Sequence, residues 1–508
     1  MEPKKIKNAL ISVYHKRGLD EILKLLAEQD VQIYSTGGTK DYIEKQGFQV
    51  HTVEALTTYP SILSGRVKTL HPKVFGGILA RREEGHLAEL EEYQIPEFDL
   101  VIVDLYPFEE TVASTDDEAA IIEKIDIGGI SLIRAAAKNY NDVLVVPSVS
   151  QYEALAQLLA KKQGFTDLED RKHMATQAFQ ISSHYDTAIY HYFIGDGVKH
   201  ALKVSMQDGS ELRYGENPHQ MGQYYGDFAH MFEILGGKPL SYNNLVDIDA
   251  AVNLMREFVG ERPTFAVLKH TNACGLACRD SVSQAWKDAL AGDPISAFGG
   301  ILICNQEIDL ETAEEIDKIF YEVLIAPAFA ADALALLQKK KKRILLRIKH
   351  YDVQNRQYKS LLNGVIQQDT DLRTETIADF TTVTKIAPSD EQIADLLFAN
   401  KLAKHLKSNT IVLAKESQLI GMGCGQTSRV DALKQAIVKA KALGFSLQES
   451  VMASDAFFPF PDCVEIAHDA GVTAVIQPGG SIKDKDSIKA ADDRAMVMVT
   501  TGIRHFKH

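Results

Sequence analysis

The chain has 508 residues, too many for one ordinary hydrophobic core, so its length favours two to four domains. A hydrophobic fraction of 45% and a charged fraction of 24% are typical of a soluble globular protein of enzyme size. The net charge of -14 argues against a nucleic-acid-binding surface, which needs a broad basic face. No apolar run reaches the ~18 residues of a membrane span, no secretory signal is recognisable, and five irregularly spaced cysteines argue against a disulfide framework. We therefore expect a cytoplasmic protein without nucleic-acid or membrane partners.

Strand and helix patterns alternate over the first ~200 residues, which predicts a largely parallel sheet covered by helices on both faces. The predicted strands are 9–14, 31–36, 100–106 and 143–146. The predicted helices are 19–28, 87–93, 130–139, 151–161 and 167–193. A Gly-Asp-Gly breaker follows the last helix, and strand character begins again near Leu202. We place the domain boundary at about residue 198, which gives domains 1–198 and 199–508.

The second domain has a mixed pattern and no repeat of fixed period. Its predicted strands are 265–268, 300–304, 410–413 and 474–476, and its predicted helices are 249–258, 313–320, 391–405 and 428–443. Two subdomains are expected to divide within the poorly patterned stretch 349–379. The basic cluster 339–343 is expected to be the solvated end of a helix that begins near Asp309, because cations complement a helix C-terminus.

A glycine-rich segment, Ser35 to Thr39, follows a predicted strand and opens a helix. Free N–H groups at a helix start, with hydroxyls beside them, form an anion cradle, although a plain turn is the alternative. The loop 64–72 concentrates Arg66, Lys68 and Thr69, the donors that a phosphorylated substrate requires. A solvated loop is the alternative there.

Polar residues also follow the strand 100–106 and precede the helix 130–139. Tyr106 stands at a strand end, where open α/β sheets bind ligands, unless it is a core tyrosine with a satisfied hydroxyl. Asp126 precedes Gly-Gly at a helix start, so an N-cap is its default role. Arg134 and Lys138 share a helix face, and their repulsion suggests an anionic ligand or a carboxylate between them.

These N-terminal segments together resemble the inosine monophosphate (IMP) cyclohydrolase domain, which has a methylglyoxal-synthase-like fold. The strings that carry the resemblance are 12–16, 35–39, 65–72, 105–108, 125–129 and 134–139. Asp104 is a departure, because the family usually carries Asn there. A carboxylate at this position would repel a phosphate or alter a neighbouring pKa.

In the second domain, Lys269 and His270 directly follow the predicted strand 265–268. A fixed cation beside a group that titrates near neutral pH suits proton transfer next to a developing negative charge. His270, Cys274 and Cys278 are evenly spaced, so a helix would align them as zinc ligands. However, no fourth ligand is evident nearby, the zinc-deaminase pattern is absent, and Gly275 opposes a helix.

Three further segments contain residue types that commonly bind ligands. The loop 212–220 sets Arg213, Tyr214 and His219 together, as a nucleotide monophosphate requires, and a polar surface loop is the alternative. The glycines of 421–429 are a weak match to a dinucleotide loop. The segment 454–462 places phenylalanines beside carboxylates, which suits a flat heteroaromatic ligand or simply a core.

With 293–300 and 408–413, these segments resemble the 5-aminoimidazole-4-carboxamide ribonucleotide (AICAR) transformylase domain. The combined resemblance covers nearly the whole chain, in the domain order of the bifunctional purine-biosynthesis family. Ala273 and Cys424 depart from the family, which favours Pro and Ala there. The resemblance implies an α/β protein: a methylglyoxal-synthase-like parallel-sheet domain, then an α/β transformylase region with deaminase-like subdomains that lack zinc.

The activity that this resemblance implies has two steps. The formyl group of 10-formyltetrahydrofolate passes to the 5-amino group of AICAR, and the product FAICAR then closes to IMP with loss of water. The folate is a co-substrate, and neither a tightly bound cofactor nor a metal is implied. The family further implies a homodimer with transformylase sites built across the interface.

The resemblance also implies residue roles. In formyl transfer, His270 is the general base, Lys269 assists proton handling or stabilises the oxyanion, and Asn409 donates a hydrogen bond. The catalytic residues implied for ring closure are Lys68, Tyr106, Asp126 and Lys138. The residues implied to bind substrates are Ser12, Lys16, Thr36, Gly38, Thr39, Arg66, Thr69, Arg213, Tyr214, His219, Asn244, Glu322, Arg429, Phe457, Asp462 and Arg504.

Two other classes of function remain as alternatives. Methylglyoxal-synthase-like domains also serve as nucleotide-sensing effector modules, a role that would leave Lys68, Tyr106 and the C-terminal constellation without a task. A zinc-dependent hydrolase or deaminase would use the His-Cys-Cys spacing, and it predicts stoichiometric metal in the purified protein.

Overall fold

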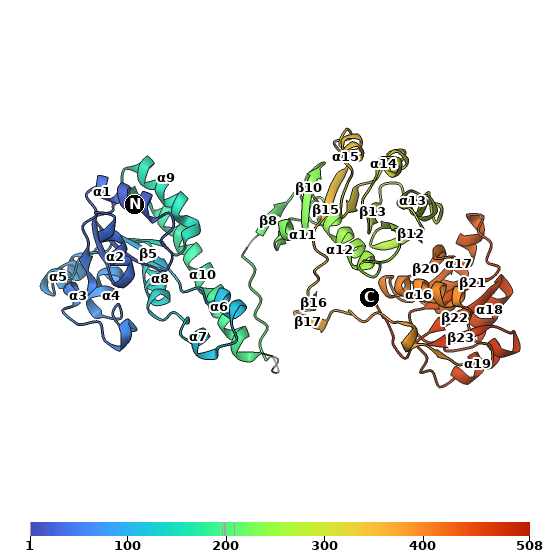
Figure 1. Cartoon of the computed structure of the whole chain (residues 1–508). Helices are drawn as coiled ribbons and strands as arrows, with labels where there is room; N and C mark the ends of the chain where they lie inside the picture. Colours follow the sequence, from blue (N-terminus) through green and yellow to red (C-terminus); the bar gives the residue numbers. More distant parts are fainter. Residues whose placement is uncertain (1, 196, 198–199, 208) are drawn as a thin grey trace. The chain divides into compact units, whose positions relative to one another are not determined.

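The computed structural model describes residues 2–195, 197, 200–207 and 209–508. The chain divides into two compact units, Met1–Gln207 and Asp208–His508 (Figure 1). The boundary that we expected at residue 198 lies outside the described residues. The strand character expected near Leu202 was wrong, because residues 202–207 have no regular secondary structure.

The first unit is built on a five-stranded parallel sheet with the order β4-β3-β2-β5-β6. The strands are β2 (Asn8–Val13), β3 (Gln32–Ser35), β4 (His51–Thr52), β5 (Leu100–Asp104) and β6 (Leu144–Val146). Ala9 pairs with Ile33 on one side and with Leu100 on the other, and the central strands are buried. A parallel sheet brings the carboxyl ends of its strands to one side, where the motifs of this unit lie.

Helices connect these strands. They are α1 (Leu19–Glu28), α2 (Gly37–Lys45), α3 (Val53–Thr57), α4 (Pro72–Leu79), α5 (Glu84–Glu92), α6 (Phe108–Ser114), α7 (Glu118–Ile122), α8 (Gly128–Lys138), α9 (Tyr152–Lys162) and α10 (Leu168–Ile194). α1 packs on α9, while α4 and α10 pack on α8. The long α10 begins at a capping box formed by Asp167 and Asp170, which satisfies free N–H groups of its first turn.

The second unit contains one twelve-stranded sheet with the order β10-β15-β14-β13-β11-β12-β20-β19-β21-β22-β23-β18. Its first half is β10 (Phe232–Gly236), β11 (Thr264–Lys269), β12 (Asn272–Cys278), β13 (Ile301–Cys304), β14 (Val323–Ala326) and β15 (Ile344–Ile348). Its second half is β18 (Thr381–Thr382), β19 (Ile411–Lys415), β20 (Gln418–Gly423), β21 (Ser450–Ser454), β22 (Val472–Gln477) and β23 (Val497–Thr500). The halves meet where Ala277 of β12 pairs with Gln418 of β20.

The two halves repeat one arrangement that no fixed sequence period reveals. Each starts with an edge strand, followed by a helix, an antiparallel hairpin and then parallel strands joined through helices. The helices of the first half are α12 (Tyr242–Arg256), α13 (Val282–Ala291), α14 (Leu310–Ile316) and α15 (Ala331–Leu337). Those of the second half are α16 (Asp390–His405), α17 (Arg429–Ala442), α18 (Asp462–Ala470) and α19 (Asp484–Asp493).

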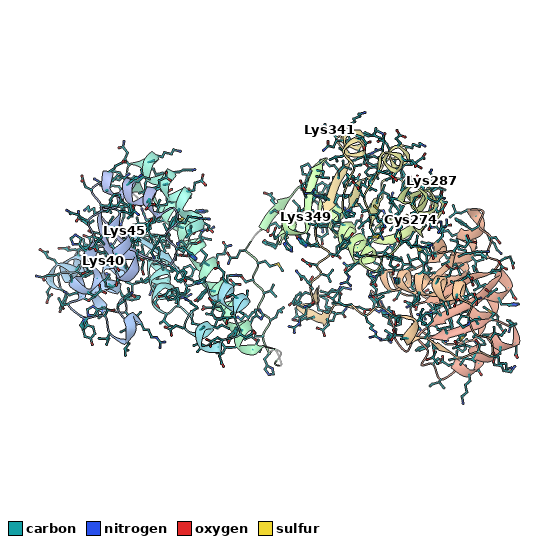
Figure 2. All side chains as sticks on the ribbon, viewed as in Figure 1. Lys40, Lys45, Cys274, Lys287, Lys341 and Lys349 are labelled. Carbon is teal, nitrogen blue, oxygen red and sulfur yellow. The ribbon has the colours of Figure 1, made fainter. Side chains whose placement is uncertain are left out.

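The helix expected from Asp309 to the basic cluster was wrong, because this stretch contains α14, β14 and α15. Lys341 does lie at the surface after α15 (Figure 2). Arg343 is instead buried, and its guanidinium bonds Asp317 at 2.6 Å and lies 4.5 Å from the Tyr321 ring centroid. Arg343, the last residue of the basic cluster 339–343, is therefore a core residue.

The stretch 349–379 connects the halves and carries a hairpin of its own. Strands β16 (Arg356–Leu361) and β17 (Gly364–Asp369) pair only with each other. A second small hairpin, β8 (Gly209–Leu212) with β9 (Gly222–Tyr225), stands at the start of the unit. None of the helices in the described part of the chain has the length and hydropathy that a membrane span requires.

Candidate active sites

In the first unit, the predicted anion cradle lies where β3 leads into α2. The α2 helix starts at Gly37, with Thr36 as its N-cap. The Thr39 hydroxyl donates to the Val13 backbone oxygen at 2.9 Å and lies 3.3 Å from the Lys16 ammonium. A Cβ atom at Gly38 would meet no atom within 4 Å, so space beside the helix start is open. The N-terminus of α2 and the end of β2 therefore lie together and form one polar wall.

Lys68 brings the cationic loop to this wall. Its ammonium nitrogen lies 2.7 Å from the position of a Cβ atom at Gly37 and 3.7 Å from that at Gly65. Both glycines have positive φ angles, of 53° and 86°. Two features favour glycine at residue 37: its backbone has a positive φ angle, and the Lys68 ammonium lies close to where a Cβ atom would stand.

Asp126 and Tyr106 form the next part of the site. The N-cap of α8 is Ile127, so Asp126 stands one residue before the position that we expected, although its carboxylate accepts the Gly129 N–H at 2.6 Å. The Tyr106 ring is 42% exposed, so it is not a core tyrosine. Burial raises the pKa of Tyr106, and the charges of Asp126 and Glu123 raise it further, so its hydroxyl stays protonated near neutral pH. Burial also raises the pKa of Asp126.

The unusual Asp104 is held by His15. The His15 N–H donates to the Asp104 carboxylate at 2.7 Å, and the imidazole Nδ1 lies 2.8 Å from the same oxygen. Burial lowers the pKa of Lys16, which the charge of Asp104 opposes. The carboxylate at this position therefore has a local partner and supports a cation of the proposed phosphate site.

Other predicted residues of this unit are occupied or distant. Arg66 pairs with Glu123, the Thr36 hydroxyl donates to Glu54 at 2.8 Å, and Ser12 lies within β2. Thr69 is buried beside Gly128. Lys138 ends α8, eleven residues long, so the rise of the helix sets it about 15 Å from the end that carries Asp126. Lys138 therefore stands at the opposite end of α8 from Asp126.

In the second unit, His270 and Thr271 form the turn between β11 and β12. Lys269 pairs with Asn272 across this two-residue turn, and φ is 51° at His270 and 67° at Thr271. Two-residue hairpins favour positive φ at both positions, but normally supply Asn or Gly there. A β-branched residue in this region is strained, and such strain concentrates at functional sites.

The turn stands at one rim of the twelve-stranded sheet, which we call the site rim: the ends of β11, β20 and β21 and the starts of β12, β13, β14 and β19. The Lys269 ammonium donates to the Phe298 backbone oxygen. Cys424 Sγ lies 3.5 Å from Asn272 Oδ1. The rim therefore gathers segments that are far apart in the sequence.

Asn409 lies on the same rim, before β19. Its side-chain amide and its backbone N–H both donate to the Gln426 backbone oxygen, at 2.9 and 3.2 Å. Glu322 precedes β14 on this rim and pairs with Lys238 at 2.5 Å. The structure thus brings Lys269, His270, Asn409 and Glu322 to one rim of one sheet.

Asp247, which sequence reasoning missed, supports the turn. Its carboxylate accepts the Thr271 N–H at 2.8 Å. Burial raises the pKa of Asp247, and the charges of His270 and Lys269 oppose that rise. No sequence motif marks Asp247, but the second half contains the same contact: Asp395 of α16 accepts the N–H groups of Glu416 and Ser417, the turn of the β19–β20 hairpin.

Two predicted binding residues have structural tasks. Asn244 forms a capping box with Ser241 at the start of α12 and is buried. Arg429 is paired with the buried Asp455 at 2.8 Å and donates to Ser454 Oγ at 3.0 Å. Both side chains thus have partners within the protein, and the substrate-binding roles expected for them stay predictions.

The remaining candidates of this unit lie on loops. Arg213 and Tyr214 follow β8, with the guanidinium 5.5 Å from the tyrosine ring centroid, and His219 is exposed in the same loop. Phe457 is 36% exposed after β21 on the site rim, and Asp462 begins α18. Arg504 is exposed near the C-terminus.

The cysteines do not form the evenly spaced ligand set of the zinc alternative. Gly275 lies within strand β12, where a Cβ atom would stand 1.9 Å from the Ala289 backbone oxygen. Cys274 and Cys278 pack into different hydrophobic clusters, and burial raises their pKa values to about 12 and about 11. Among the described residues, one group has metal-ligand spacing, and its members are the exposed side chains of His230, His350 and Asp352.

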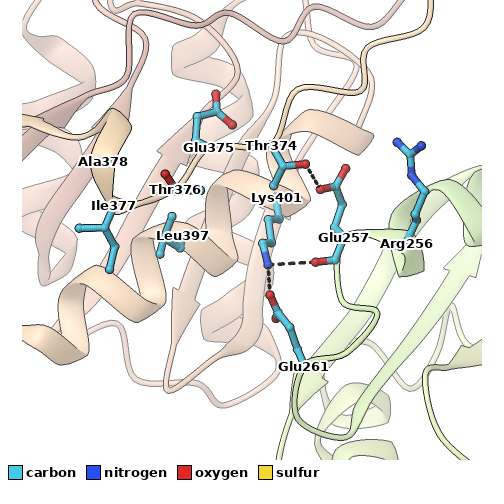
Figure 3. Close-up of a pocket in the computed structure, with 10 residues that line it drawn as sticks. All are labelled: Arg256, Glu257, Glu261, Thr374, Glu375, Thr376, Ile377, Ala378, Leu397 and Lys401. Atoms are coloured by element: carbon cyan, nitrogen blue, oxygen red, sulfur yellow. Dashed lines mark hydrogen bonds and ion pairs between the residues drawn. The ribbon is translucent and has the colours of Figure 1, made fainter. Parts of the chain in front are cut away.

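A cavity of about 540 Å³ lies away from these residues, between α12 and α16 (Figure 3). Lys401 spans its wall by pairing with Glu261 and donating to the Glu257 backbone oxygen at 2.9 Å. Its lining contains no predicted catalytic residue. Lys404 and His405 beside it bond the Glu257 carboxylate at 2.8 and 2.9 Å, which ties the two halves of the unit together.

Comparisons with known proteins fit this arrangement. Residues 136–439 match the family described as AICARFT/IMPCHase bienzyme, and residues 18–131 match the MGS-like domain. The bifunctional purine biosynthesis protein PurH of Bacteroides thetaiotaomicron is 60% identical over 509 residues, which cover 100% of both chains. The proteins of the same name from Pelodictyon phaeoclathratiforme and Ligilactobacillus salivarius are each 44% identical and cover 99% of this chain, and 99% and 100% of their own.

Proposed function

The chain belongs to the AICARFT/IMPCHase bienzyme family, and on that premise we propose how its two units catalyse the last two steps of IMP synthesis. It is a bifunctional enzyme that transfers a formyl group from 10-formyltetrahydrofolate to AICAR and closes FAICAR to IMP. The observation that carries the assignment of residues is the strained Lys269–His270–Thr271 turn on the same sheet rim as Asn409. Formyl transfer belongs to the second unit and ring closure to the first.

In formyl transfer, the 5-amino nitrogen of AICAR attacks the formyl carbon, and tetrahydrofolate leaves with its nitrogen protonated. The amine is conjugated to an electron-poor ring, so it needs positioned proton removal. His270 removes that proton, while Lys269 and Asn409 stabilise the oxyanion on the formyl carbon. Phe457 and Asp462 contact the folate, Glu322 orients the carboxamide, and Arg213, Tyr214, His219 and Arg504 hold the ribose phosphate.

In ring closure, the carboxamide nitrogen of FAICAR attacks the formyl carbon, and the resulting carbinol loses water to give IMP. Lys68 and the protonated Tyr106 hydroxyl stabilise the oxyanion, and Asp126 moves the proton. The start of α2, with Lys16 and Thr39, holds the phosphate, because free N–H groups and the helix dipole favour an anion there.

Lys138 ends α8 and Asp126 precedes its start, and this separation leads us to place the enzyme in a homodimer. A second copy of the chain would supply Lys138 to the site that contains Asp126. The β16–β17 hairpin supports the same assembly, because an isolated hairpin is marginally stable in water and this one exposes Tyr358, Val365 and Ile366 by 43 to 54%. The five free thiols suit the reducing cytoplasm.

Light scattering after size-exclusion chromatography tests the homodimer, for which a monomeric mass is the contradicting result. Mixing tests the sharing of Lys138. Lys68→Ala and Lys138→Ala variants, each inactive in ring closure alone, should recover activity when co-refolded, because a mixed dimer contains one intact site. Absence of recovery, with mixed dimers demonstrated, would remove Lys138 from the mechanism.

A further inference from the structure

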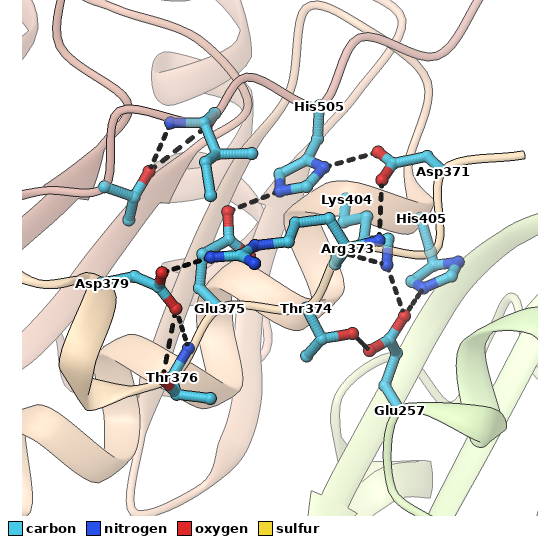
Figure 4. A network of polar contacts seen from close by, with 12 residues as sticks. Glu257, Asp371, Arg373, Thr374, Glu375, Thr376, Asp379, Lys404, His405 and His505 are labelled. Atoms are coloured by element: carbon cyan, nitrogen blue, oxygen red, sulfur yellow. Dashed lines mark hydrogen bonds and ion pairs between the residues drawn. The ribbon is translucent and has the colours of Figure 1, made fainter. Parts of the chain in front are cut away.

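His505 is held between two carboxylates near the C-terminus, and its side chain is 3% exposed. Its Nδ1 lies 2.6 Å from Asp371 Oδ2, and its Nε2 lies 2.6 Å from Glu375 Oε1 (Figure 4). An ionised carboxylate only accepts hydrogen bonds, so both ring nitrogens donate and the ring is an imidazolium cation. Burial lowers the pKa of His505, but the bonds to Asp371 and Glu375 outweigh burial and raise the pKa to about 9.

The other charges around the ring are engaged elsewhere. Lys404 of α16 is committed to Glu257 at 2.8 Å. Asp455, whose backbone oxygen accepts the His505 N–H at 3.1 Å, has Arg429 as its own partner. The other charged side chains of the segments 371–379 and 504–507 are Arg373, Asp379, Arg504 and Lys507, of which Arg373 pairs with Asp379. His505 is therefore the cation that partners the buried Glu375.

The segment that His505 anchors runs beside Asn409. The Lys507 N–H donates to Ser408 Oγ at 3.1 Å, and the Ser408 N–H donates to the Lys507 backbone oxygen at 2.9 Å. Arg504 directly precedes His505 and is exposed, with its guanidinium 4.3 Å from the Phe506 ring centroid. One short segment thus carries a buried cation, an exposed cation and two bonds to the residue before Asn409.

We propose that His505 is a positioning residue for formyl transfer: its buried cation ties the C-terminal segment, which carries Arg504 and bonds the residue before Asn409, to residues 371–375 and thereby limits the motion of Arg504. The inference rests on the proposed function, in which Arg504 holds the substrate phosphate. If the C-terminal segment were flexible, it would lose conformational entropy each time Arg504 bound a phosphate. The bonds of His505 to Asp371 and Glu375, which we call the His505 clamp, order the segment before the substrate binds.

The first test replaces His505 with Gln and uses His508→Gln, an exposed imidazole on the same segment, as the matched control. His505→Gln should raise the KM for AICAR in formyl transfer by ~10-fold or more with a smaller change in kcat, because ground-state binding is lost. Ring closure, catalysed by the other unit, should be unchanged, and His508→Gln should resemble the parent. A lower unfolding temperature with an unchanged KM would show that His505 only stabilises the fold, and would overturn the proposal.

The second test keeps the geometry of the His505 clamp and removes the negative charge of Glu375. In the parent, the KM for AICAR should rise as the pH passes about 9, because the clamp is complete below that pKa and is lost above it. Glu375→Gln keeps an acceptor for Nε2 but removes one negative charge, so the rise should move to lower pH. A rise that stays in place would overturn the proposal. Failure of the proposed function would look different, since the parent protein would then transfer no formyl group.

Discussion

The ammonium nitrogen of Lys68 lies 2.7 Å from the point where a Cβ atom at Gly37 would stand. A side chain at residue 37 would therefore displace the Lys68 ammonium from its place beside the start of α2. This contact joins the proposed oxyanion-stabilising cation to the proposed phosphate cradle.

Gly37→Ala should reduce ring closure by ~10²-fold or more, because the new methyl group displaces the cation that stabilises the oxyanion. Formyl transfer should be unchanged. Gly85→Ala in α5 is the control, since a Cβ atom there meets nothing within 4 Å and φ is not positive. Steady-state assays of both reactions check this, and normal ring closure by Gly37→Ala would contradict the placement of Lys68.

The internal repeat supplies a matched pair for Asp247. Asp247→Ala and Asp395→Ala each free N–H groups of a hairpin turn, so each should lower the free energy of unfolding by about 1–3 kcal/mol. Only Asp247→Ala should also lower kcat of formyl transfer, by ~10–100-fold, because only its turn carries His270. Equal kcat values for the two variants would contradict a positioning role for Asp247.

Backbone strain at Thr271 predicts that a substitution relieving it will stabilise the fold and slow formyl transfer. Thr271→Gly should raise the free energy of unfolding by about 1 kcal/mol, because glycine adopts the φ of 67° without steric cost. Formyl transfer should slow, since the turn that carries His270 becomes more mobile. Ser417→Gly, at φ 52° in the corresponding turn, should be stabilising without slowing transfer. Urea unfolding combined with the transfer assay checks both effects, and a destabilised Thr271→Gly would refute the strain.

The Glu257 cluster predicts loss of stability in acid. Burial lowers the pKa of His405 from 6.5 to about 4, against the opposing effect of its bond to Glu257. Between pH 6.5 and pH 4, His405 is protonated in the unfolded chain but neutral in the folded chain. The free energy of unfolding therefore falls as the pH drops from 6.5 to 4. Burial raises the pKa of Glu257, but its bonds to His405, Lys404 and Thr374 lower it to about 2, which adds a further loss below pH 4.5.

Urea denaturation as a function of pH measures this loss. Glu257→Gln should be less stable at pH 7 by about 3 kcal/mol, because Lys404 is left as a buried charge without its partner. Its stability should also depend less on pH below 4.5. A parent protein whose unfolding midpoint is constant from pH 7 to pH 4 would contradict the assignment.

Local signals in the sequence predicted local structure well. The helix expected at 19–28 is α1, whose apolar spacing and acidic first turn agree. The four strands expected in the first unit lie within two residues of β2, β3, β5 and β6, whereas the short β4 was not expected. The strand before Lys269 was also found, because its apolar run is bounded by polar residues.

Features that depend on contacts between residues far apart in the sequence could not be predicted from the sequence. The continuous sheet depends on the contact of Ala277 with Gln418, and the burial of Arg343 depends on Asp317. Asp247 carries no motif, and its role appears only when α12 lies against the turn. The separation of Lys138 from Asp126, by contrast, follows from helical rise alone once α8 is known.

The central claim is that two separate sites, one in each unit, carry out the two reactions. Its most direct test is to assay both reactions in Lys269→Ala, His270→Ala and Lys68→Ala. We expect the first two variants to lose formyl transfer and keep closure of supplied FAICAR, and Lys68→Ala to do the reverse. Normal formyl transfer in both Lys269→Ala and His270→Ala, or normal ring closure in Lys68→Ala, would contradict the account.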